Sequence, residues 1–377
     1  MMVMINKQLK IIYLDFDDIR NPLLGAGQAR ATYQVATRLI KKGNEVEVYC
    51  SKYPGYRSRV ESGIKYTHIG LGSRFVRLNN LIYILALPFV VRKIRADIIV
   101  ECFTAPTSTL FSPLFTKIPV VALSTSFEAE RFAKLYHLPF DKVEKFGLRF
   151  YKYFLPSSKF FEMKIRKVNP GVVSKVVAQG VDEKYLNVKP VKHPKHILFL
   201  GRLDVGQKGI DLLLKAYKKV AKSLAYPLII VGHGPDENQV HGLIKKYRLE
   251  KKVKLVGAIF GKKKDRLLSE AIIFTVPSRN EGFCIAALEA IAVGVPVVCF
   301  DIPGLSWIPG HVALKAKAFN VDSYAKHIVR AIKTDVNKKL RKECKKVASN
   351  YSWDDVTGEY EKFFQFMVED NRKKQLT

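Results

Sequence analysis

Two glutamates in the C-terminal half of the sequence have a spacing from which a ligand site can be built. Glu281 precedes a run of small and apolar residues that contains Glu289, and this run predicts a packed helix from Gly282 to Ala292 with Glu281 at its start. At about 1.5 Å of rise per residue, the two carboxylates lie roughly 12 Å apart. That span matches the distance from the sugar to the ribose of a nucleotide-sugar. The simpler alternative, a helix that carries two glutamates, has the same pattern.

The start of this predicted helix is also a candidate phosphate site. Gly282, Phe283 and Cys284 fall in its expected first turn, where backbone N–H groups have no partner within the helix. These groups and the positive end of the helix dipole favour an anion.

Two cations upstream have the chemistry to hold a diphosphate. Ile197–Leu200 reads as a buried strand that Gly201 and Arg202 end, and Lys208 precedes a periodic helix over 210–220. Arg202 and Lys208 are therefore expected at the carboxyl edge of a parallel sheet, where ligands bind. Positioned Arg and Lys side chains stabilise departing phosphates. The alternative is a pair of solvated surface cations.

Together with other markers, these segments resemble the family 4 glycosyltransferases. The markers are, in chain order, Gly25-Ala26-Gly27, Val177-Ala178-Gln179-Gly180-Val181-Asp182, GRLDVGQKG at 201–209, Val231-Gly232-His233-Gly234-Pro235, Pro277-Ser278, Glu281 with Glu289, and Gly294-Val295-Pro296. The match is specific in the C-terminal half and looser in the N-terminal half. Gln179 stands where the family usually has Asn, and the segment 124–128 lacks the histidine that many members carry there.

The resemblance implies an α/β protein with the GT-B fold, two Rossmann-like doubly wound domains facing across a cleft. It also implies a retaining transfer of a hexose from a nucleoside-diphosphate sugar to a hydroxyl acceptor, as in cell-envelope polysaccharide synthesis. Arg202 and Lys208 would stabilise the departing diphosphate, Glu281 would bind the sugar hydroxyls and Glu289 the ribose. The expected donor-binding residues are completed by Gly25, Gly27, Gly201, Gly232, Gly282, Phe283 and Cys284. Neither a metal nor another cofactor is expected.

Length and periodicity predict the domain boundaries. A chain of 377 residues is longer than a single hydrophobic core ordinarily serves, so two domains are expected. Strand and helix patterns alternate in two series, which indicates two parallel sheets. We expect an N-terminal acceptor-binding domain over 1–186 and a C-terminal donor-binding domain over 187–351, and the resemblance implies that a last helix over 352–377 crosses back to the first domain.

The loops after the N-terminal strands are the expected acceptor region. Phe103, Thr125, Ser126 and Glu128 lie after predicted strands over 98–101 and 120–123. The nearby carboxylates at 15, 17 and 18 could attract a hard cation, but a polar strand end is the preferred interpretation.

Charge is the one compositional extreme, because the formal net charge is +30. Such a surface attracts anionic lipid or nucleic acid. Residues 142–167 interleave aromatics with cations, and Val143, Phe146, Phe150 and Phe154 would share one helical face. Packing of that face against the sheet is the slightly preferred alternative. The apolar run 81–91 is too short to span a bilayer and is interpreted as a core helix.

Five scattered cysteines and the lack of a secretory signal at the start of this sequence predict a cytoplasmic protein with reduced thiols, with a peripheral position on the inner face of the plasma membrane left open. The basic charge is compatible with a lipid-linked acceptor. Three alternatives to the transferase are a nucleotide-sugar 2-epimerase of the same fold, a basic nucleic-acid-binding protein and a glycosyltransferase-like subunit without activity. The second is disfavoured because no RNA-binding signature is visible, and nucleic acid is not an expected partner.

Overall fold

The computed structural model describes residues 8–23, 27–105, 108, 110–125, 127–188 and 191–376. The chain forms two compact units. Unit 1 consists of the residues up to Gln179 together with those from Trp353 onward, and unit 2 is Gly180–Ser352. The first junction lies earlier than the expected one at residues 186 and 187.

Unit 1 is built on an eight-stranded sheet with the order β3-β4-β2-β1-β5-β6-β7-β8. The pairs between described strands are parallel apart from β3 with β4. The strands are β1 (Lys10–Leu14), β2 (Glu45–Ser51), β3 (Arg59–Glu61), β4 (Ile64–Ile69), β5 (Ile98–Cys102), β6 (Val120–Ser124), β7 (Tyr153–Pro156) and β8 (Val173–Ser174). The helices are α1 (Gly27–Lys41), α2 (Val76–Lys93), η1 (Ser112–Phe115), α3 (Ala129–Tyr136), α4 (Phe140–Gly147), η2 (Leu148–Phe150), α5 (Lys159–Val168) and α14 (Trp353–Leu376).

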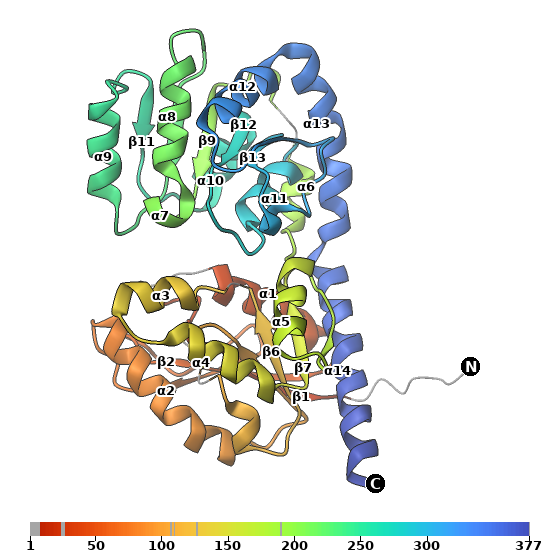
Figure 1. Ribbon diagram of the computed structural model, residues 1–377. Coiled ribbons are helices and arrows are strands. Elements are labelled where there is room, and N and C mark those ends of the chain that lie inside the picture. Colours follow the sequence, from red (N-terminus) through yellow and green to blue (C-terminus); the bar gives the residue numbers. More distant parts are fainter. Residues whose placement is uncertain are drawn as a thin grey trace. The chain divides into compact units, whose positions relative to one another are not determined.

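Two hydrophobic cores cover the two faces of this sheet. On one face α1 and α14 pack against the strands, and α14 contributes Trp353, Tyr360 and Phe364 to that core. On the other face α2 contributes Tyr83 and Leu87. Figure 1 shows α14 and α2 on opposite sides of the sheet. The last helix of the chain is therefore part of the core of unit 1.

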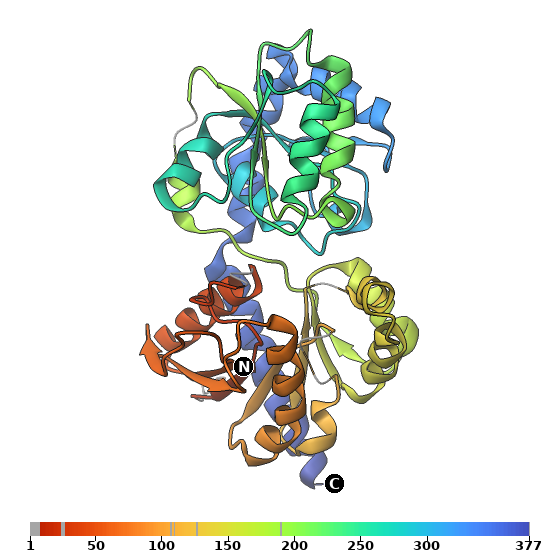
Figure 2. The same ribbon diagram turned by 90° about the vertical axis from the view of Figure 1, so that its left-hand side faces the viewer.

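Unit 2 has a six-stranded parallel sheet with the order β11-β10-β9-β12-β13-β14. Its elements are α6 (Glu183–Asn187), β9 (His196–Leu200), α7 (Val205–Lys208), α8 (Ile210–Val220), β10 (Leu228–Val231), α9 (Glu237–Lys246), β11 (Val253–Leu255), α10 (Gly261–Ser269), β12 (Ala271–Val276), α11 (Ile285–Ala292), β13 (Val297–Phe300), η3 (Pro303–Leu305), β14 (Ala313–Ala316), α12 (Val321–Ile332), α13 (Thr334–Ala348) and η4 (Ser349–Tyr351). Helix α8 contacts α9 and α12, whereas α11 contacts α10 and α13, which gives two helix layers around the sheet (Figure 2). Within the described residues, no helix is both long and apolar enough to cross a bilayer.

Two expectations about helices need correction. Residues 142–167 are not one amphipathic helix, because α4 ends at Gly147 and Phe154 is buried in strand β7. Helix α2 is a core helix on one side only. It buries Tyr83 and Leu87 but exposes Leu85 on its other side.

Candidate functional site

The candidate donor site lies where the sheet of unit 2 changes its winding direction. From β9 the chain continues to β10 and β11 on one side and then returns to β12 on the other side of β9. At such a switch point the loops after the two central strands diverge and leave a crevice at the carboxyl edge. The loop after β9 carries Arg202 and leads into α7, and the loop after β12 carries Glu281.

Lys208 and Glu281 form an ion pair between these two loops, in which Glu281 is buried and 19% of the Lys208 side chain is exposed. The Lys208 Nζ donates to Glu281 Oε1 at 2.8 Å, and the Ser278 hydroxyl donates to the same oxygen at 2.7 Å. Burial lowers the pKa of the Lys208 ammonium, but Glu281 outweighs this effect and the net pKa is raised. Lys208 is therefore a largely covered ammonium at the sheet edge that keeps its charge at neutral pH.

The backbone around Lys208 is fixed by tight packing. Gly209 has a φ of +64°, and a Cβ atom there would lie 2.0 Å from the carbonyl oxygen of Pro277. Arg279 clamps the same loop, since its guanidinium donates twice to Asp211 at 2.9 Å and once to the Val205 carbonyl at 2.8 Å. These contacts hold the loop after β12 against α7, so that Lys208 and Glu281 meet.

Arg202 is exposed and lies close enough to act electrostatically on Lys208. Its Nη2 donates to Gln207 Oε1 at 2.7 Å, and its positive charge lowers the pKa of Lys208. Gly201 and Gly232 meet at the ends of β9 and β10, because a Cβ atom at Gly232 would lie 1.9 Å from the Gly201 carbonyl oxygen. The structure thus gathers Arg202, Lys208 and Glu281 with these two glycines along one sheet edge.

The expected helix start at Gly282 is wrong. Helix α11 begins at Ile285, and Cys284 precedes it with a left-handed φ of +71°. Gly282 and Phe283 therefore belong to the loop after β12, and the 12 Å estimate for two carboxylates on one helix does not apply. Phe283 stacks on Trp307, with ring centroids 4.3 Å apart, and Trp307 Nε1 donates to the Phe283 carbonyl at 2.5 Å.

Glu289 has a partner that sequence reasoning missed. Lys264 Nζ lies 2.6 Å from one Glu289 oxygen and 2.7 Å from the other, and only 11% of the Lys264 side chain and 6% of the Glu289 side chain are exposed. The sequence places Lys264 in the basic run 262–264, where it resembles any surface lysine. Only the packing of α10 against α11 brings it to Glu289.

In unit 1 the sheet switches direction between β1 and β5, and a polar cluster lies at that edge. Thr125 Oγ1 donates to Gln28 Oε1 at 2.8 Å, and Gln28 Nε2 lies 3.4 Å from Cys102 Sγ. Thr32 Oγ1 donates to Asp15 Oδ2 at 2.6 Å. Burial raises the pKa of Asp15 to about 6. Of these, Thr125 was a predicted acceptor residue and Asp15 belonged to the predicted carboxylate cluster, whereas sequence reasoning missed Thr32 and Cys102.

The other predicted site residues of unit 1 do not join this polar cluster in the part of the chain that the structure describes. Phe103 is fully buried, and its ring packs against Tyr151 and Phe154. It therefore belongs to the core, and its prediction as an acceptor contact is wrong. Glu128 precedes α3, and its Oε2 lies 3.5 Å from an Arg131 nitrogen. Gly27 is the first residue of α1. Gly25 and Ser126 lie outside the described residues.

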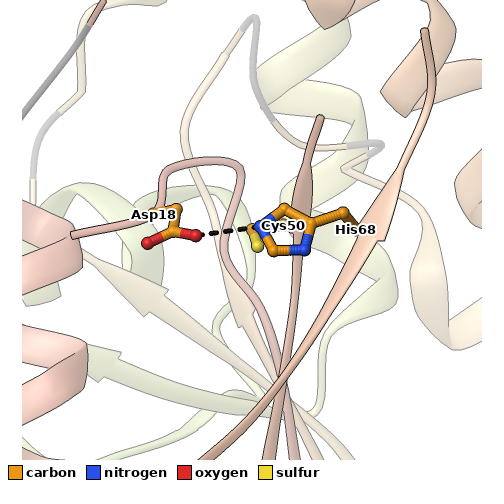
Figure 3. Close-up of side chains that lie close together, drawn as sticks. All are labelled: Asp18, Cys50 and His68. Atoms are coloured by element: carbon orange, nitrogen blue, oxygen red, sulfur yellow. Dashed lines mark hydrogen bonds and ion pairs between the residues drawn. The ribbon is translucent and has the colours of Figure 1, made fainter. Parts of the chain in front are cut away.

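Asp18, from the carboxylate cluster after β1, lies beside Cys50 of β2 and His68 of β4. The possible metal-ligand atoms of these three residues lie within 4.8 Å of one another (Figure 3). His68 Nε2 is 2.9 Å from Asp18 Oδ2, and the Arg59 guanidinium donates to both Asp18 oxygens at 2.7 Å. Burial opposes ionisation of Asp18, but Arg59 and His68 hold its pKa well below the usual range. Burial raises the pKa of the Cys50 thiol. The Asp18 carboxylate is already held by a guanidinium, and the Cys50 thiol keeps its proton. Both observations favour a structural ion pair at a polar strand end over a metal site.

Comparison with known proteins agrees with this architecture. The model of the family described as Glycosyltransferase Family 4 matches residues 25–185, and the model described as Glycosyl transferases group 1 matches residues 182–351. A glycosyltransferase of Methanocaldococcus jannaschii is 32% identical over 46% of this chain and 46% of its own. A GDP-mannose:cellobiosyl-diphosphopolyprenol alpha-mannosyltransferase of Xanthomonas oryzae is 28% identical over 49% of this chain and 51% of its own. The chain therefore spans about half the length of these two relatives.

Among solved structures, sucrose-phosphate synthase of Thermosynechococcus elongatus superimposes with a TM-score of 0.80 at 18% identity, over 97% of this chain and 100% of that one. At that identity the likeness is one of fold, and it confirms the expected pair of Rossmann-like domains. Two family models that together match residues 25–351, two parallel α/β sheets and the ordered set of motifs lead to one conclusion. The chain belongs to glycosyltransferase family 4 and has the GT-B fold.

Proposed function

We propose that this protein is a retaining glycosyltransferase that moves a hexose from a nucleoside-diphosphate sugar to a hydroxyl acceptor. The observation that carries the proposal is the contact between Lys208 and Glu281 at the switch point of the unit 2 sheet. A partly exposed ammonium beside a buried carboxylate offers a donor for phosphate oxygens and an acceptor for sugar hydroxyls within one hydrogen-bond length of each other. Family membership supports the same assignment.

In the proposed reaction the acceptor oxygen forms a bond to the anomeric carbon while the bond from that carbon to the β-phosphate oxygen breaks. The departing phosphate oxygen takes the acceptor's proton on the same face of the sugar, so the configuration is retained. Lys208 and Arg202 stabilise the negative charge that develops on the diphosphate. Glu281 orients the donor sugar, and Glu289 binds the ribose. These cations supply the charge stabilisation, and we propose that transfer needs neither a metal nor another cofactor.

For the acceptor we propose a lipid-linked saccharide at the cytoplasmic face of a membrane. The mannosyltransferase of Xanthomonas oryzae is named for a diphosphopolyprenol acceptor, and the strongly basic chain suits an acceptor that carries a diphosphate. The named relatives are transferases, which favours transfer over the epimerase alternative.

The test begins with thermal-shift binding of a panel of nucleoside diphosphates and nucleotide-sugars at low and high salt. A rise in melting temperature that is selective for one base and persists at high salt supports the donor site. That nucleotide-sugar is then incubated with a lipid-diphosphate saccharide, and NMR of the product identifies the new linkage as α or β. The same anomeric configuration as in the donor supports a retaining transfer. Shifts that vanish for every anion as salt rises would contradict the proposal, and release of an altered nucleotide-sugar without acceptor would identify an epimerase.

A further inference from the structure

Helix α2 of unit 1 presents an apolar face to water. Its buried residues Asn79, Tyr83, Leu87 and Val91 recur every four positions and face the sheet. The residues on the opposite side are large and apolar, where an ordinary surface helix carries polar side chains. They are Leu78, Leu81, Leu85 and Phe89, preceded by Phe75, and their exposed fractions run from 40% to 75%. These five residues are called the α2 face below.

Neighbouring elements extend the α2 face. Helix α2 packs on η1, where Leu114 is also exposed, and the Arg92 guanidinium lies 5.4 Å from the ring of Phe115. At the other end of α2, Arg77 lies 4.8 Å from the ring of Tyr136 in α3. Further exposed apolar residues follow on α3, α4 and the segment between them, namely Leu135, Leu138, Val143 and Phe146. An apolar surface of this extent marks an interaction site.

The charges around the α2 face indicate what it contacts. No Asp or Glu occurs anywhere from 62 to 96 in the sequence. Exposed cations flank the face at both ends of the helix, namely Arg74 and Arg77 at the start and Arg92, Lys93 and Arg95 at the end. An apolar stripe between two basic clusters complements a bilayer, since the apolar side chains enter the acyl region while the cations meet anionic headgroups.

We infer that the α2 face docks unit 1 on an anionic lipid surface, with α2 lying in the plane of the interface. At about 1.5 Å per residue the helix is roughly 27 Å long, and cations at both ends keep it from crossing the bilayer. Figure 1 shows α2 on the side of the unit 1 sheet that is opposite to α14. Docking therefore leaves the α14 side of the sheet facing away from the lipid.

The placement of α2 also links the lipid surface to the acceptor region. Helix α2 follows β4, so it starts at the carboxyl edge of the sheet. The contact of Thr125 with Gln28 lies at that same edge. A lipid-linked acceptor in the bilayer would thus enter near the start of α2. This last step rests on the proposed function, whereas lipid docking itself does not.

The experiment is co-sedimentation of the full chain with vesicles, without donor or acceptor. Vesicles of phosphatidylcholine alone are compared with vesicles that also contain phosphatidylglycerol. We expect binding to the anionic vesicles only. The triple variant Leu81→Gln, Leu85→Gln and Phe89→Gln should bind at least about tenfold more weakly, because three apolar side chains no longer enter the bilayer. Its melting temperature should match that of the wild type, since these side chains are exposed.

A matched control carries the same type of change on other elements, namely Met163→Gln, Phe260→Gln and Phe366→Gln, all exposed apolar residues. It should bind vesicles like the wild type. As a second measurement, hydrogen exchange across 76–93 should slow when anionic vesicles are added. Equal vesicle binding by the triple variant, or equal loss in the control, overturns the inference.

Gel filtration tests whether a second copy of this chain, and not a lipid surface, covers the α2 face. If the triple variant changes the oligomeric state and leaves vesicle binding intact, the α2 face is an interface between copies of this chain and the inference fails. Nucleoside-diphosphate binding by the triple variant should be unchanged. Failure of the donor site and failure of lipid docking therefore give different results.

Discussion

The ammonium of Lys208 lies 2.8 Å from a carboxylate oxygen of Glu281, although the two residues follow different strands of the unit 2 sheet. The contact exists because β9 and β12 are neighbours, and Gly209 and Arg279 hold their loops together. Each of the two side chains neutralises the other until a ligand arrives. A diphosphate and a sugar hydroxyl can then take up the remaining hydrogen-bonding capacity of both groups.

Lys208→Ala should reduce kcat/KM for the nucleotide-sugar by about 10²- to 10³-fold, because the leaving diphosphate loses a preorganised cation. Steady-state kinetics with varied donor gives the value. Lys215→Ala, at an exposed lysine of the neighbouring helix α8, is the control and should leave turnover unchanged. An unaffected rate in Lys208→Ala would remove Lys208 from the donor site.

Glu281→Gln should shift the alkaline limit of diphosphate binding to lower pH. Burial lowers the pKa of Lys208, and Glu281 is the main group that raises it. Without that carboxylate the ammonium loses its proton at a lower pH and no longer holds the phosphate. In the wild type the stabilisation from this pair is present below the unfolded lysine pKa and is lost as pH rises through the higher folded value. Calorimetric titration of a nucleoside diphosphate from pH 7 to pH 10 measures the limit, and identical profiles for the two proteins would contradict this account.

Lys264→Met should destabilise unit 2 by about 3 kcal/mol, because Glu289 is left as an unpaired buried carboxylate. Denaturant unfolding measures this loss. The double variant Lys264→Met with Glu289→Gln should recover part of it, since the second change removes the stranded charge. If the loss in the double variant equals the sum of the losses in Lys264→Met and Glu289→Gln alone, the two side chains are not coupled.

Asp15 should make the stability of unit 1 fall as pH rises from about 4 to about 6. Its folded pKa is about 6, above the value of an unfolded aspartate, so the folded state binds the proton more tightly and ionisation disfavours it. The loss is complete above pH 6 and amounts to roughly 3 kcal/mol. Asp15→Asn should remove this part of the pH dependence, whereas Asp335→Asn, at an exposed site, should not. Thermal unfolding across this pH range is the measurement, and an unchanged slope in Asp15→Asn would refute the assignment.

Arg59→Met should cost about 3 to 5 kcal/mol, because the buried carboxylate of Asp18 loses the guanidinium that holds both of its oxygens. A chelator such as EDTA should leave the melting temperature of the wild type unchanged if this pair is structural. A clear drop in melting temperature with EDTA would instead assign a metal to Asp18, Cys50 and His68.

Local sequence signals predicted the central strands, because apolar runs such as Ile197–Leu200 end at a glycine. They missed the strands β3, β7, β8 and β14. They failed at the start of α11. Small and apolar residues from Gly282 onward continue the helical pattern, but Cys284 takes a left-handed conformation that delays the helix to Ile285. Composition does not report that backbone angle.

Contacts between residues far apart in the sequence could not be predicted either, because they depend on how the elements pack. The ion pair of Lys264 with Glu289 depends on how α10 packs on α11. The exposed Leu81 and Leu85 sit in an apolar run that looks like a core segment, because periodicity gives the faces of a helix and not which of them meets water. The stretch 142–167 was read as one helix since its aromatics repeat at helical spacing, yet Tyr153–Pro156 pair with β6 as a strand.

The core of unit 1 contains side chains from both ends of the chain, since Tyr13 of β1 and Phe364 of α14 belong to the same cluster. During synthesis on a ribosome, the first strands emerge long before the last helix. All of unit 2 is translated in between, so it is free to fold first. Unit 1 must wait for the final segment of about two dozen residues to cover one face of its sheet. Premature termination ahead of Trp353 would therefore leave an intact second unit attached to an N-terminal unit with an uncovered apolar face.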